Sequence, residues 1–245
     1  MSAGIFGLAL VLVFATMGPV AAFKLTPIEI TLKPTGRGAS GSVVLQNPSE
    51  VPAAVELTVH ERAMDLEGTD NLTPSPDRFL VIPSQVILMP GMEQAVRLQW
   101  LGGLVDEERA FRLVAEQLPI DLEDGQADGG RMRLLVRYVA SLYVRPEGAE
   151  PKVRVTRGRV DAGTAGPELT FDVVNSGKAR VALSSLMVQA SRKGRTLLDL
   201  DSGRLGEVSG SVVLAGHTRR FRIPLESSGA PKTGPITVDL DYDGR

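Results

Sequence analysis

Period-two alternation of apolar residues is the feature that most constrains the fold of this chain. It recurs in short runs along almost the whole sequence, and the 3.6-residue period of an amphipathic helix is nearly absent. Turn-forming residues separate the runs, for example Asn47-Pro48 and Pro90-Gly91. Short alternating strands separated by turns at this spacing are typical of an antiparallel sandwich. The pattern therefore predicts an all-β protein.

The runs fall into two sets, which predict two β-sandwiches in tandem. The first set comprises Ile28–Leu32, Ser42–Leu45, Val55–Val59, Phe79–Ile82, Val86–Leu88, Ala95–Trp100, Phe111–Glu116 and a long strand over 131–146. The second set comprises Val153–Val155, Leu169–Val174, Val181–Val188, Thr196–Leu200, Ser211–Leu214, Arg219–Ile223 and Ile236–Leu240. The interval Pro146-Glu147-Gly148-Ala149-Glu150-Pro151 is typical of a linker. We therefore place one sandwich at residues 23–146, the linker at 147–151 and the other sandwich at 152–245.

Residues 1–22 predict a secretory signal peptide. An uncharged apolar stretch over Ile5–Phe14 is followed by small residues, and Val20-Ala21-Ala22 fits a cleavage site before Phe23. The stretch lacks a preceding Lys or Arg, so an uncleaved N-terminal anchor is the alternative. A membrane span needs about 20 apolar residues, and no later run approaches that length. We expect an exported mature chain without a membrane span.

The composition argues against several classes of function. The chain has no cysteine, and two domains of about 100 residues can each bury a sufficient core without disulfides. The net charge of −2 gives no general reason to expect binding to nucleic acid or to an anionic membrane.

Residues of the kind that carry catalysis are sparse. There are two histidines: His60 fits an ordinary strand position, and His217 fits an exposed turn. Nucleophile and phosphate-binding motifs are absent from the sequence, and the carboxylates of IDLEDGQADGG (120–130) lack the spacing of a calcium loop. We expect no enzyme activity, no cofactor and no metal.

The segment RMRLLVRYVASLYVRP (131–146) is unusual for a strand in this setting. Its first half places bulky apolar residues beside arginines, whereas its second half reads as buried on both faces. Strands in globular proteins are most often about five to six residues long. Periodicity alone does not explain why so long a strand shows Met132, Leu134 and Val136 in this way.

Several stretches together resemble the PapD-like periplasmic chaperones of pilus (fimbrial) assembly. In the first half these are Asn47-Pro48-Ser49, Glu61-Arg62, residues 79–100, residues 108–120 and Leu142-Tyr143-Val144-Arg145-Pro146. In the second half they are Val174-Asn175-Ser176-Gly177 and Asp241-Tyr242-Asp243-Gly244. The resemblance implies two immunoglobulin-like sandwiches in an angled arrangement. It also implies a chaperone of the chaperone–usher type in the periplasm, with pilus-type subunits and an outer-membrane usher as partners and no use of ATP.

The resemblance also implies a role for the long strand. In this family the last strand of the first domain is lent to a subunit whose own sandwich lacks a strand, a form of β-augmentation. Such a strand supplies ladder hydrogen bonds and alternate side chains to an exposed apolar groove. The family's donor positions fall on Met132, Leu134 and Val136. The alternative is that these residues face this protein's own core.

The chain departs from the family in the cleft where an arginine and a lysine hold the subunit's terminal carboxylate. The arginine's position falls on Glu29 and the lysine's on Ser141. Glu29 would repel a carboxylate, whereas an arginine would pair with it. Either the register differs slightly, or Arg137 and Lys24 replace the pair, or the client is anchored differently, which is the explanation we favour.

The resemblance further implies an ion cluster between the domains, at Arg97, Arg145 and Asp241. Two arginines around one carboxylate would fix the angle between sandwiches that otherwise share few contacts. The alternative is that each is a separately solvated charge. For the protein as a whole, the alternative to a chaperone is a PapD-like scaffold in an envelope assembly that no longer binds clients.

Overall fold

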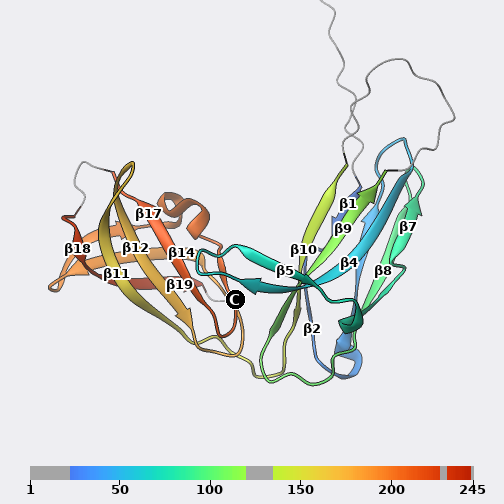
Figure 1. The fold of residues 1–245 in the computed structure, drawn as a ribbon, viewed down its shortest axis with the longest axis horizontal. Coiled ribbons are helices and arrows are strands. Elements are labelled where there is room, and N and C mark those ends of the chain that lie inside the picture. The colour runs from blue at the N-terminus through green and yellow to red at the C-terminus, as the bar shows by residue number, and fades with distance from the viewer. Residues whose placement is uncertain (1–22, 120–134, 227–230, 244–245) are drawn as a thin grey trace, which may run out of the picture.

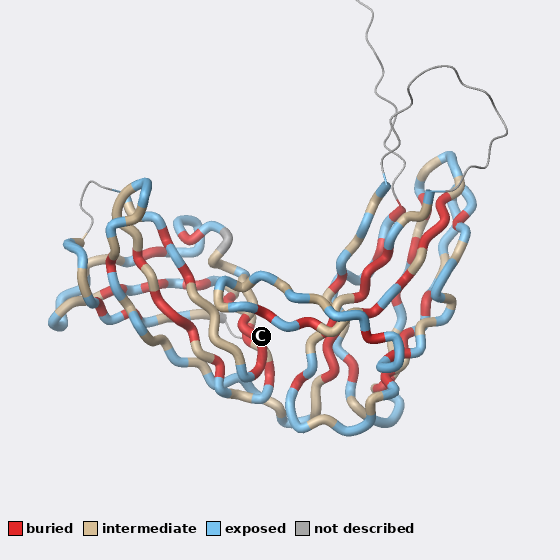
Figure 2. The backbone as a smooth tube through the Cα atoms, viewed as in Figure 1, coloured by how far each residue is buried: buried red, intermediate tan, exposed pale blue. Residues whose placement is uncertain are grey.

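The computed structural model describes residues 23–119, 135–226 and 231–243, which form two β-sandwiches that meet at an angle (Figure 1). The expected all-β fold of two tandem immunoglobulin-like sandwiches is confirmed. Each sandwich has its own buried interior, which Figure 2 shows as red stretches on either side of the bend. The predicted signal peptide lies outside the described residues.

The first sandwich contains β1 to β10 in two sheets. The strands are β1 (Lys24–Thr26), β2 (Glu29–Leu32), β3 (Ser40–Gln46), β4 (Ala53–Met64), β5 (Asp70–Pro74), β6 (Phe79–Ile82), β7 (Gln85–Leu88), β8 (Glu93–Trp100), β9 (Arg109–Leu118) and β10 (Arg137–Val144). Two 3-10 helices, η1 (Gly36–Ala39) and η2 (Pro76–Arg78), lie in the connections. One sheet has the order β1-β3-β8-β6, and the other has β2-β10-β9-β4-β5 with β7 also paired to β4.

Strand β8 shows how the alternation builds the first core. Val96, Leu98 and Trp100 are buried, whereas Arg97 is exposed between them. This follows because successive side chains of a strand point to opposite faces of the sheet. The ring of Trp100 packs against Phe111 of the facing sheet, with ring centroids 5.5 Å apart. The period-two pattern thus identifies the core residues correctly along this strand.

The second sandwich contains β11 to β19 and one short helix. The elements are β11 (Val153–Gly163), β12 (Gly166–Asn175), β13 (Val181–Ala182), β14 (Ser184–Arg192), β15 (Arg195–Leu200), α1 (Ser202–Leu205), η3 (Gly206–Val208), β16 (Val212–Val213), β17 (Thr218–Pro224), β18 (Gly234–Pro235) and β19 (Thr237–Asp243). The larger sheet has the order β17-β12-β11-β18, and β15-β14-β19 and β13-β16 form the others. Strand β10 ends at Val144 and β11 begins at Val153, so the linker expected at 147–151 falls between them.

Two side chains of the first sandwich belong to the buried core of the second. Met64 lies at the end of β4, and Tyr143 lies near the end of β10 and is fully buried. Both pack with apolar residues of β11 to β19. The two sandwiches therefore share apolar contact at their junction in addition to the covalent linker.

A buried asparagine fastens a turn in each sandwich. Asn47 donates from Nδ2 to the carbonyl oxygens of Val51 and Leu88 at 2.8 and 2.9 Å. Asn175 shares its two Nδ2 hydrogens among three carbonyl oxygens, and its Oδ1 accepts from two backbone N–H groups. The partners of Asn175 are Ala179, Val213 and Leu214 as acceptors, and Lys152 and Gly177 as donors. Both asparagines are fully buried, and these bonds satisfy their amides without water.

Some strands differ from the expected ranges. Strand β4 runs for 12 residues, beyond the expected Val55–Val59. The expected strand Val181–Val188 is broken at Leu183, because β13 pairs with β16 whereas β14 pairs with β15 and β19 in another sheet. The long strand expected over 131–146 is described only from residue 135, and its ladder begins at Arg137.

Candidate functional site

Strand β10 has an unpaired edge over half of its length. The whole strand pairs antiparallel with β9, whereas β2 covers only Ser141–Val144 on the other side, in parallel pairing. Among the described residues, no strand pairs with this second edge at residues 137–140. The backbone N–H and C=O groups along it are therefore available to another strand.

Apolar side chains accompany this free edge. Val136 and Tyr138 pack against the core of the first sandwich and are only half-buried, and β2 does not extend far enough to cover them. Val139, on the opposite face of the sheet, is 46% exposed. Val136 thus contacts its own core, as the alternative reading of the donor positions allows. Met132 and Leu134 lie outside the described residues.

The structure brings together the two positions at which the sequence departs from the resembled family. Ser141 and Glu29 are Cα partners in the pairing of β10 with β2. The Glu29 carboxylate lies 2.6 Å from Nη2 of Arg180, which belongs to the second sandwich. The hydroxyl of Ser141 accepts a hydrogen bond from Nη1 of Arg112, which lies opposite it on β9. A guanidinium from the neighbouring strand therefore stands beside Ser141.

Arg112 shares the carboxylate of Asp70 with Arg62. Asp70 Oδ2 lies 2.6 Å from Nη2 of Arg112, and Oδ1 lies 2.6 Å from Nε of Arg62. Nη1 of Arg62 also donates to the hydroxyl of Tyr143 at 3.1 Å. All three charged side chains are largely withdrawn from water, so their interactions are screened less than those at the surface. Two guanidiniums against one carboxylate leave an excess of positive charge at this point of the junction.

A second ion cluster, centred on Glu108, joins the two sandwiches. The Glu108 side chain is 1% exposed, and its Oε2 lies 2.8 Å from Nη1 of Arg180 and 2.8 Å from Nε of Arg145. The Arg145 N–H is not aligned with the oxygen, so this contact is an ion pair without a hydrogen bond. Oε1 accepts from the backbone N–H of Arg180 at 3.1 Å. The guanidinium of Arg180 also lies 3.6 Å above the ring of Tyr143.

The structure does not bring Arg97, Arg145 and Asp241 together as the expected ion cluster. Arg97 donates to the hydroxyl of Ser40 at 3.3 Å, and Asp241 is exposed on β19 opposite Met187. Neither forms an ion pair with any described residue. Arg97 lies on the outer face of the sheet β1-β3-β8-β6, whereas the strands that contact the second sandwich belong to the other sheet. Of the three, Arg145 alone reaches the junction, where it meets Glu108.

Sequence reasoning missed Glu108, Arg180 and Arg112. Glu108 immediately precedes the alternating run of β9, and Arg180 follows the Asn-Ser-Gly turn, so each reads locally as a solvated charge. Their pairing joins residues 72 positions apart. No spacing within a single strand encodes such a contact. The sequence gives one indication of Glu108: its carboxylate stands directly before a strand whose apolar residues are buried.

A hollow on the first sandwich lies over β4, β6 and β9 and reaches β10 at one residue. Its volume is about 590 Å³, and its lining includes His60, Val114 and Arg137. Arg137 is the residue of β10 that lines the hollow, and its Nε lies 3.8 Å from Oε2 of Glu116 on β9. His60 lies within β4, as expected of an ordinary strand residue, and its Nε2 is 3.1 Å from Oγ1 of Thr58. His217 is half-buried after a turn, where an exposed side chain was expected.

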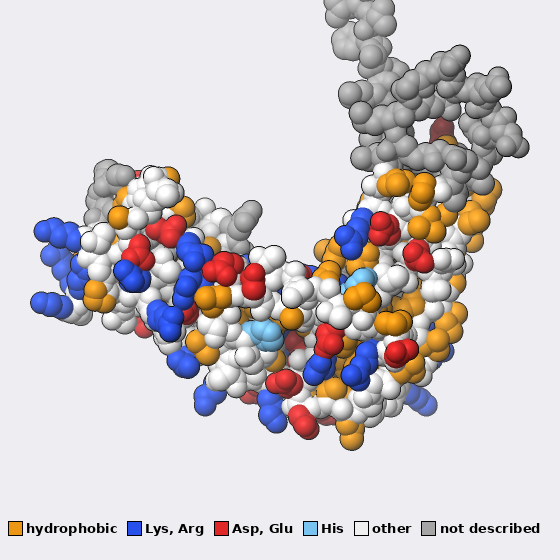
Figure 3. Space-filling model, viewed as in Figure 1, with side chains coloured by type: hydrophobic (Ala, Val, Ile, Leu, Met, Phe, Trp, Pro, Cys, Tyr) orange, Lys and Arg blue, Asp and Glu red, His pale blue; other side chains and the backbone are white. Residues whose placement is uncertain are grey.

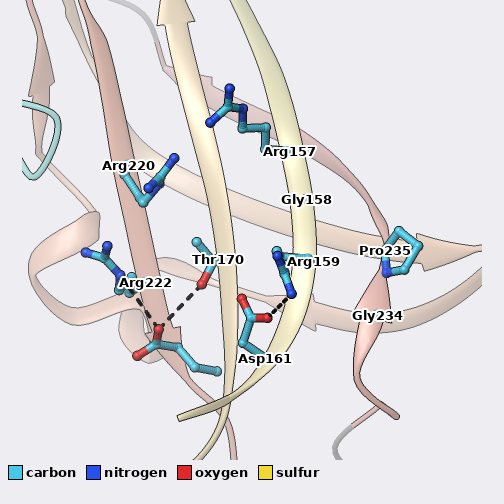
Figure 4. A pocket seen from close by; sticks show the side chains of 10 residues that line it. Arg157, Gly158, Arg159, Asp161, Thr170, Arg220, Arg222, Gly234 and Pro235 are labelled. Carbon is cyan, nitrogen blue, oxygen red and sulfur yellow. Dashed lines mark hydrogen bonds and ion pairs between the residues drawn. The ribbon is translucent and has the colours of Figure 1, made fainter.

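Another hollow, of about 710 Å³, lies on the sheet of β11, β12 and β17 and is lined by arginines (Figure 4). Figure 3 shows Lys and Arg side chains gathered at this end of the molecule and hydrophobic side chains over the first sandwich. Each of these arginines faces a carboxylate: Arg159 with Asp161, Arg222 with Glu168 and Glu67, and Arg157 and Arg220 with Asp172. The charges are balanced locally, so this hollow does not indicate an anion site.

Within the described ranges, no group of three or more His, Asp or Glu side chains is placed to hold a metal ion. No helix in the same ranges is long and apolar enough to cross a membrane.

Comparison with known proteins gives one family match. The model of the family described as "Pili and flagellar-assembly chaperone, PapD N-terminal domain" matches residues 23–150. No curated protein sequence matches the chain significantly.

Solved structures share the fold at low sequence identity. A chain of the CsuC–CsuE chaperone–tip adhesion subunit complex of Acinetobacter baumannii has a TM-score of 0.58 and 19% identity, covering 89% of this chain and 98% of that one. The Escherichia coli chaperone DraB has a TM-score of 0.54 and 18% identity, with coverages of 85% and 89%. A chain of the Salmonella enterica complex of SafA pilin with the SafB chaperone has a TM-score of 0.53 and 16% identity, with coverages of 84% and 86%. These likenesses extend the shared fold over both sandwiches.

Proposed function

Since this chain belongs to the family of pili and flagellar-assembly chaperones that share the PapD N-terminal domain, we propose that it binds pilus-type subunits and completes their sandwiches with its own edge strand. The observation that carries the proposal is the unpaired edge of β10 at residues 137–140. The chain would reach the periplasm through the signal peptide at 1–22 and pass its client to an outer-membrane usher. It would act without ATP and without catalysis.

The free edge of β10 suits strand donation for two reasons. A client strand can pair with it where β2 stops covering β10, and the ladder then continues into the client. Val136 and Tyr138 are half-buried at the open side of the sandwich, so a client would complete their burial. We propose that Met132, Leu134 and Val136 are the side chains that the client receives.

Arg112 is the residue we propose for anchoring the client's carboxylate. It stands beside Ser141, where the family has a lysine, and its guanidinium can bind a carboxylate in bidentate fashion. Asp70 holds Arg112 in place, and Arg62 balances the charge of Asp70. Glu29 is occupied by Arg180, which reduces its repulsion of an incoming carboxylate.

The solved structures that share the fold support this function, because two of them are complexes of a chaperone with a pilus subunit. One is a chaperone–tip subunit complex, and another holds a pilin with its chaperone. We do not favour the alternative of a scaffold without clients, because the free edge of β10 and its half-buried apolar residues remain open to a client.

Purification of the tagged chain from the periplasm of its own host tests the proposal. We expect one small β-rich exported protein to accompany the wild type, identified by mass spectrometry. Leu134→Asp should keep the fold and lose this protein, because a charge cannot enter an apolar groove without a large desolvation cost. Ile87→Asp is the matched control, since Ile87 is exposed on β7, which does not adjoin β10.

Emission from Trp100, the sole tryptophan, verifies that each variant is folded. If a folded Leu134→Asp variant retains the client at the wild-type level, strand donation at this segment is refuted. If the wild type carries no β-rich subunit at all, the chaperone function itself fails.

A further inference from the structure

The β4–β5 hairpin extends from the first sandwich to the second. In Figure 1 its strands cross between the two bodies, and its turn lies against the second. The hairpin pairs from His60 with Pro74 to Met64 with Asp70, and residues 65–69 form the turn. The side chain of Asp65 closes this turn: its Oδ1 accepts a hydrogen bond from the backbone N–H of Thr69 at 2.8 Å. The tip is therefore an ordered structure.

The tip covers the open edge of β17, which is the end strand of its sheet. The backbone N–H of Arg220 donates to the carbonyl of Leu66 at 2.6 Å. This bond satisfies a donor on an edge that would otherwise face solvent. Beside it, Glu67 Oε1 lies 3.3 Å from Nη2 of Arg222, so a charge pair accompanies the backbone contact.

Gly68 allows the close approach of the two sandwiches at this point. Its φ is +88°, and a Cβ added there would overlap Nε and Cζ of Arg219. The Arg219 guanidinium lies 5.0 Å from the ring centroid of Phe221 and donates to the carbonyl of Val212 at 3.1 Å. Burial lowers the pKa of Arg219, and the charge of Arg62 lowers it further. The guanidinium is thus enclosed between the hairpin and its own sheet.

The pair that adjoins the turn, Met64 with Asp70, is also fixed. Met64 is buried in the core of the second sandwich, and Asp70 is held by Arg62 of β4 and Arg112 of β9. At the tip, the contacts of Leu66 and Glu67 with β17 share no residue with the linker or with the cluster around Glu108. The two sandwiches are therefore joined at two places, and rotation about one is resisted by the other.

We infer that the β4–β5 hairpin is a strap that fixes the angle between the two sandwiches. Domains joined by a linker and a small polar interface are expected to move relative to each other. The strap adds a backbone hydrogen bond, a charge pair and a buried side chain at a second point, and so suppresses that motion. This inference does not depend on the identity of any client.

Distances between spin labels on introduced cysteines test the strap in the full chain. The chain has no native cysteine, so labels at Glu50→Cys and Arg195→Cys, both exposed, report one distance between the sandwiches. Gly68→Ala introduces the clash with Arg219. Gly91→Ala is its control, because Gly91 also has a positive φ of +72° but an added Cβ would meet nothing within 4 Å.

We expect a narrow distance distribution for the wild type and for Gly91→Ala, and one about twofold broader for Gly68→Ala, as free domain motion predicts. Glu67→Lys, which faces Arg222 with a like charge, should also broaden it, whereas Glu93→Lys at an exposed site of β8 should not. If both folded strap variants keep the wild-type distribution, or if Gly91→Ala broadens it as much as Gly68→Ala, the strap is refuted.

Discussion

Replacing Glu108 with glutamine removes a buried carboxylate that links the two sandwiches. Glutamine keeps the size of the side chain and one acceptor oxygen, so the bond from the backbone N–H of Arg180 can survive. Its amide nitrogen, however, cannot accept from a guanidinium. Arg145 and Arg180 would therefore lose the negative charge that both share at 2.8 Å.

The cost can be worked out from the exposure of the three side chains. Removing one partner of a buried ion pair costs about 3–5 kcal/mol, because the remaining charge stays uncompensated. Glu108 is enclosed, but the Arg145 side chain is 32% exposed and Arg180 keeps Glu29, so water and a second carboxylate recover part of this. We expect a loss of about 2–3 kcal/mol in the free energy of unfolding.

Urea unfolding with two probes measures this loss. Trp100, the sole tryptophan, reports the first sandwich, and far-UV circular dichroism reports both. With a urea slope of about 2 kcal/mol per molar, the midpoint of Glu108→Gln should fall by about 1–1.5 M. The two probes should also separate, since the sandwiches lose their shared charge.

A variant of an exposed ion pair controls for the loss of charge itself. Glu61 pairs with Arg109 on the surface, so Glu61→Gln should cost at most about 1 kcal/mol. A Glu108→Gln midpoint equal to that of Glu61→Gln would refute the view that the buried carboxylate holds the junction.

Two further variants test the proposed client anchor, Arg112, and the stability of the second sandwich. Arg112→Gln should reduce the recovered client about tenfold or more, as expected for the loss of one charged anchor, whereas Arg109→Gln, a control on the same strand, should not. Equal recovery from both, measured by quantitative mass spectrometry, would exclude Arg112 as the anchor. Asn175→Ala should lower the unfolding free energy of the second sandwich by about 3 kcal/mol or more, because several buried backbone groups lose their partners. A thermal transition by circular dichroism that stays at the wild-type temperature would contradict this.

The sequence was sufficient to predict the fold because period-two alternation reports directly which side chains are buried. In β8 each apolar position of the pattern is in the core and Arg97 is outside. The position at which a run divides between two sheets was harder to predict. The run is interrupted at Leu183 because the residues before and after it pair with different strands, which alternation does not report. The hairpin β4–β5 was missed because Asp70–Pro74 carries no alternation of its own and is placed by pairing with β4.

The site was predictable only where its residues lie along one strand. The free edge of β10 lies next to the start of β2, which the alternation in 28–32 located to within one residue. The charged contacts of the junction depend on how the two sandwiches meet. The family resemblance pointed to Arg97 and Asp241, whereas the contacts are made by Glu108 and Arg180. Arg112 was missed because it reaches Ser141 across the ladder, and a single sequence does not contain that register.

The way in which Asn175 is held bears on the chemical ageing of this protein. An asparagine followed by a small residue loses its amide group when the next backbone nitrogen attacks the side-chain carbonyl carbon, a common cause of thermal lability. Here the nitrogen of Ser176 is engaged with the carbonyl of Lys152 at 2.8 Å, and both ends of the Asn175 amide are bound. The attacking atom and its target are thus held out of reaction geometry. The turn that fastens the second sandwich also keeps its asparagine from deamidating for as long as the sandwich stays folded.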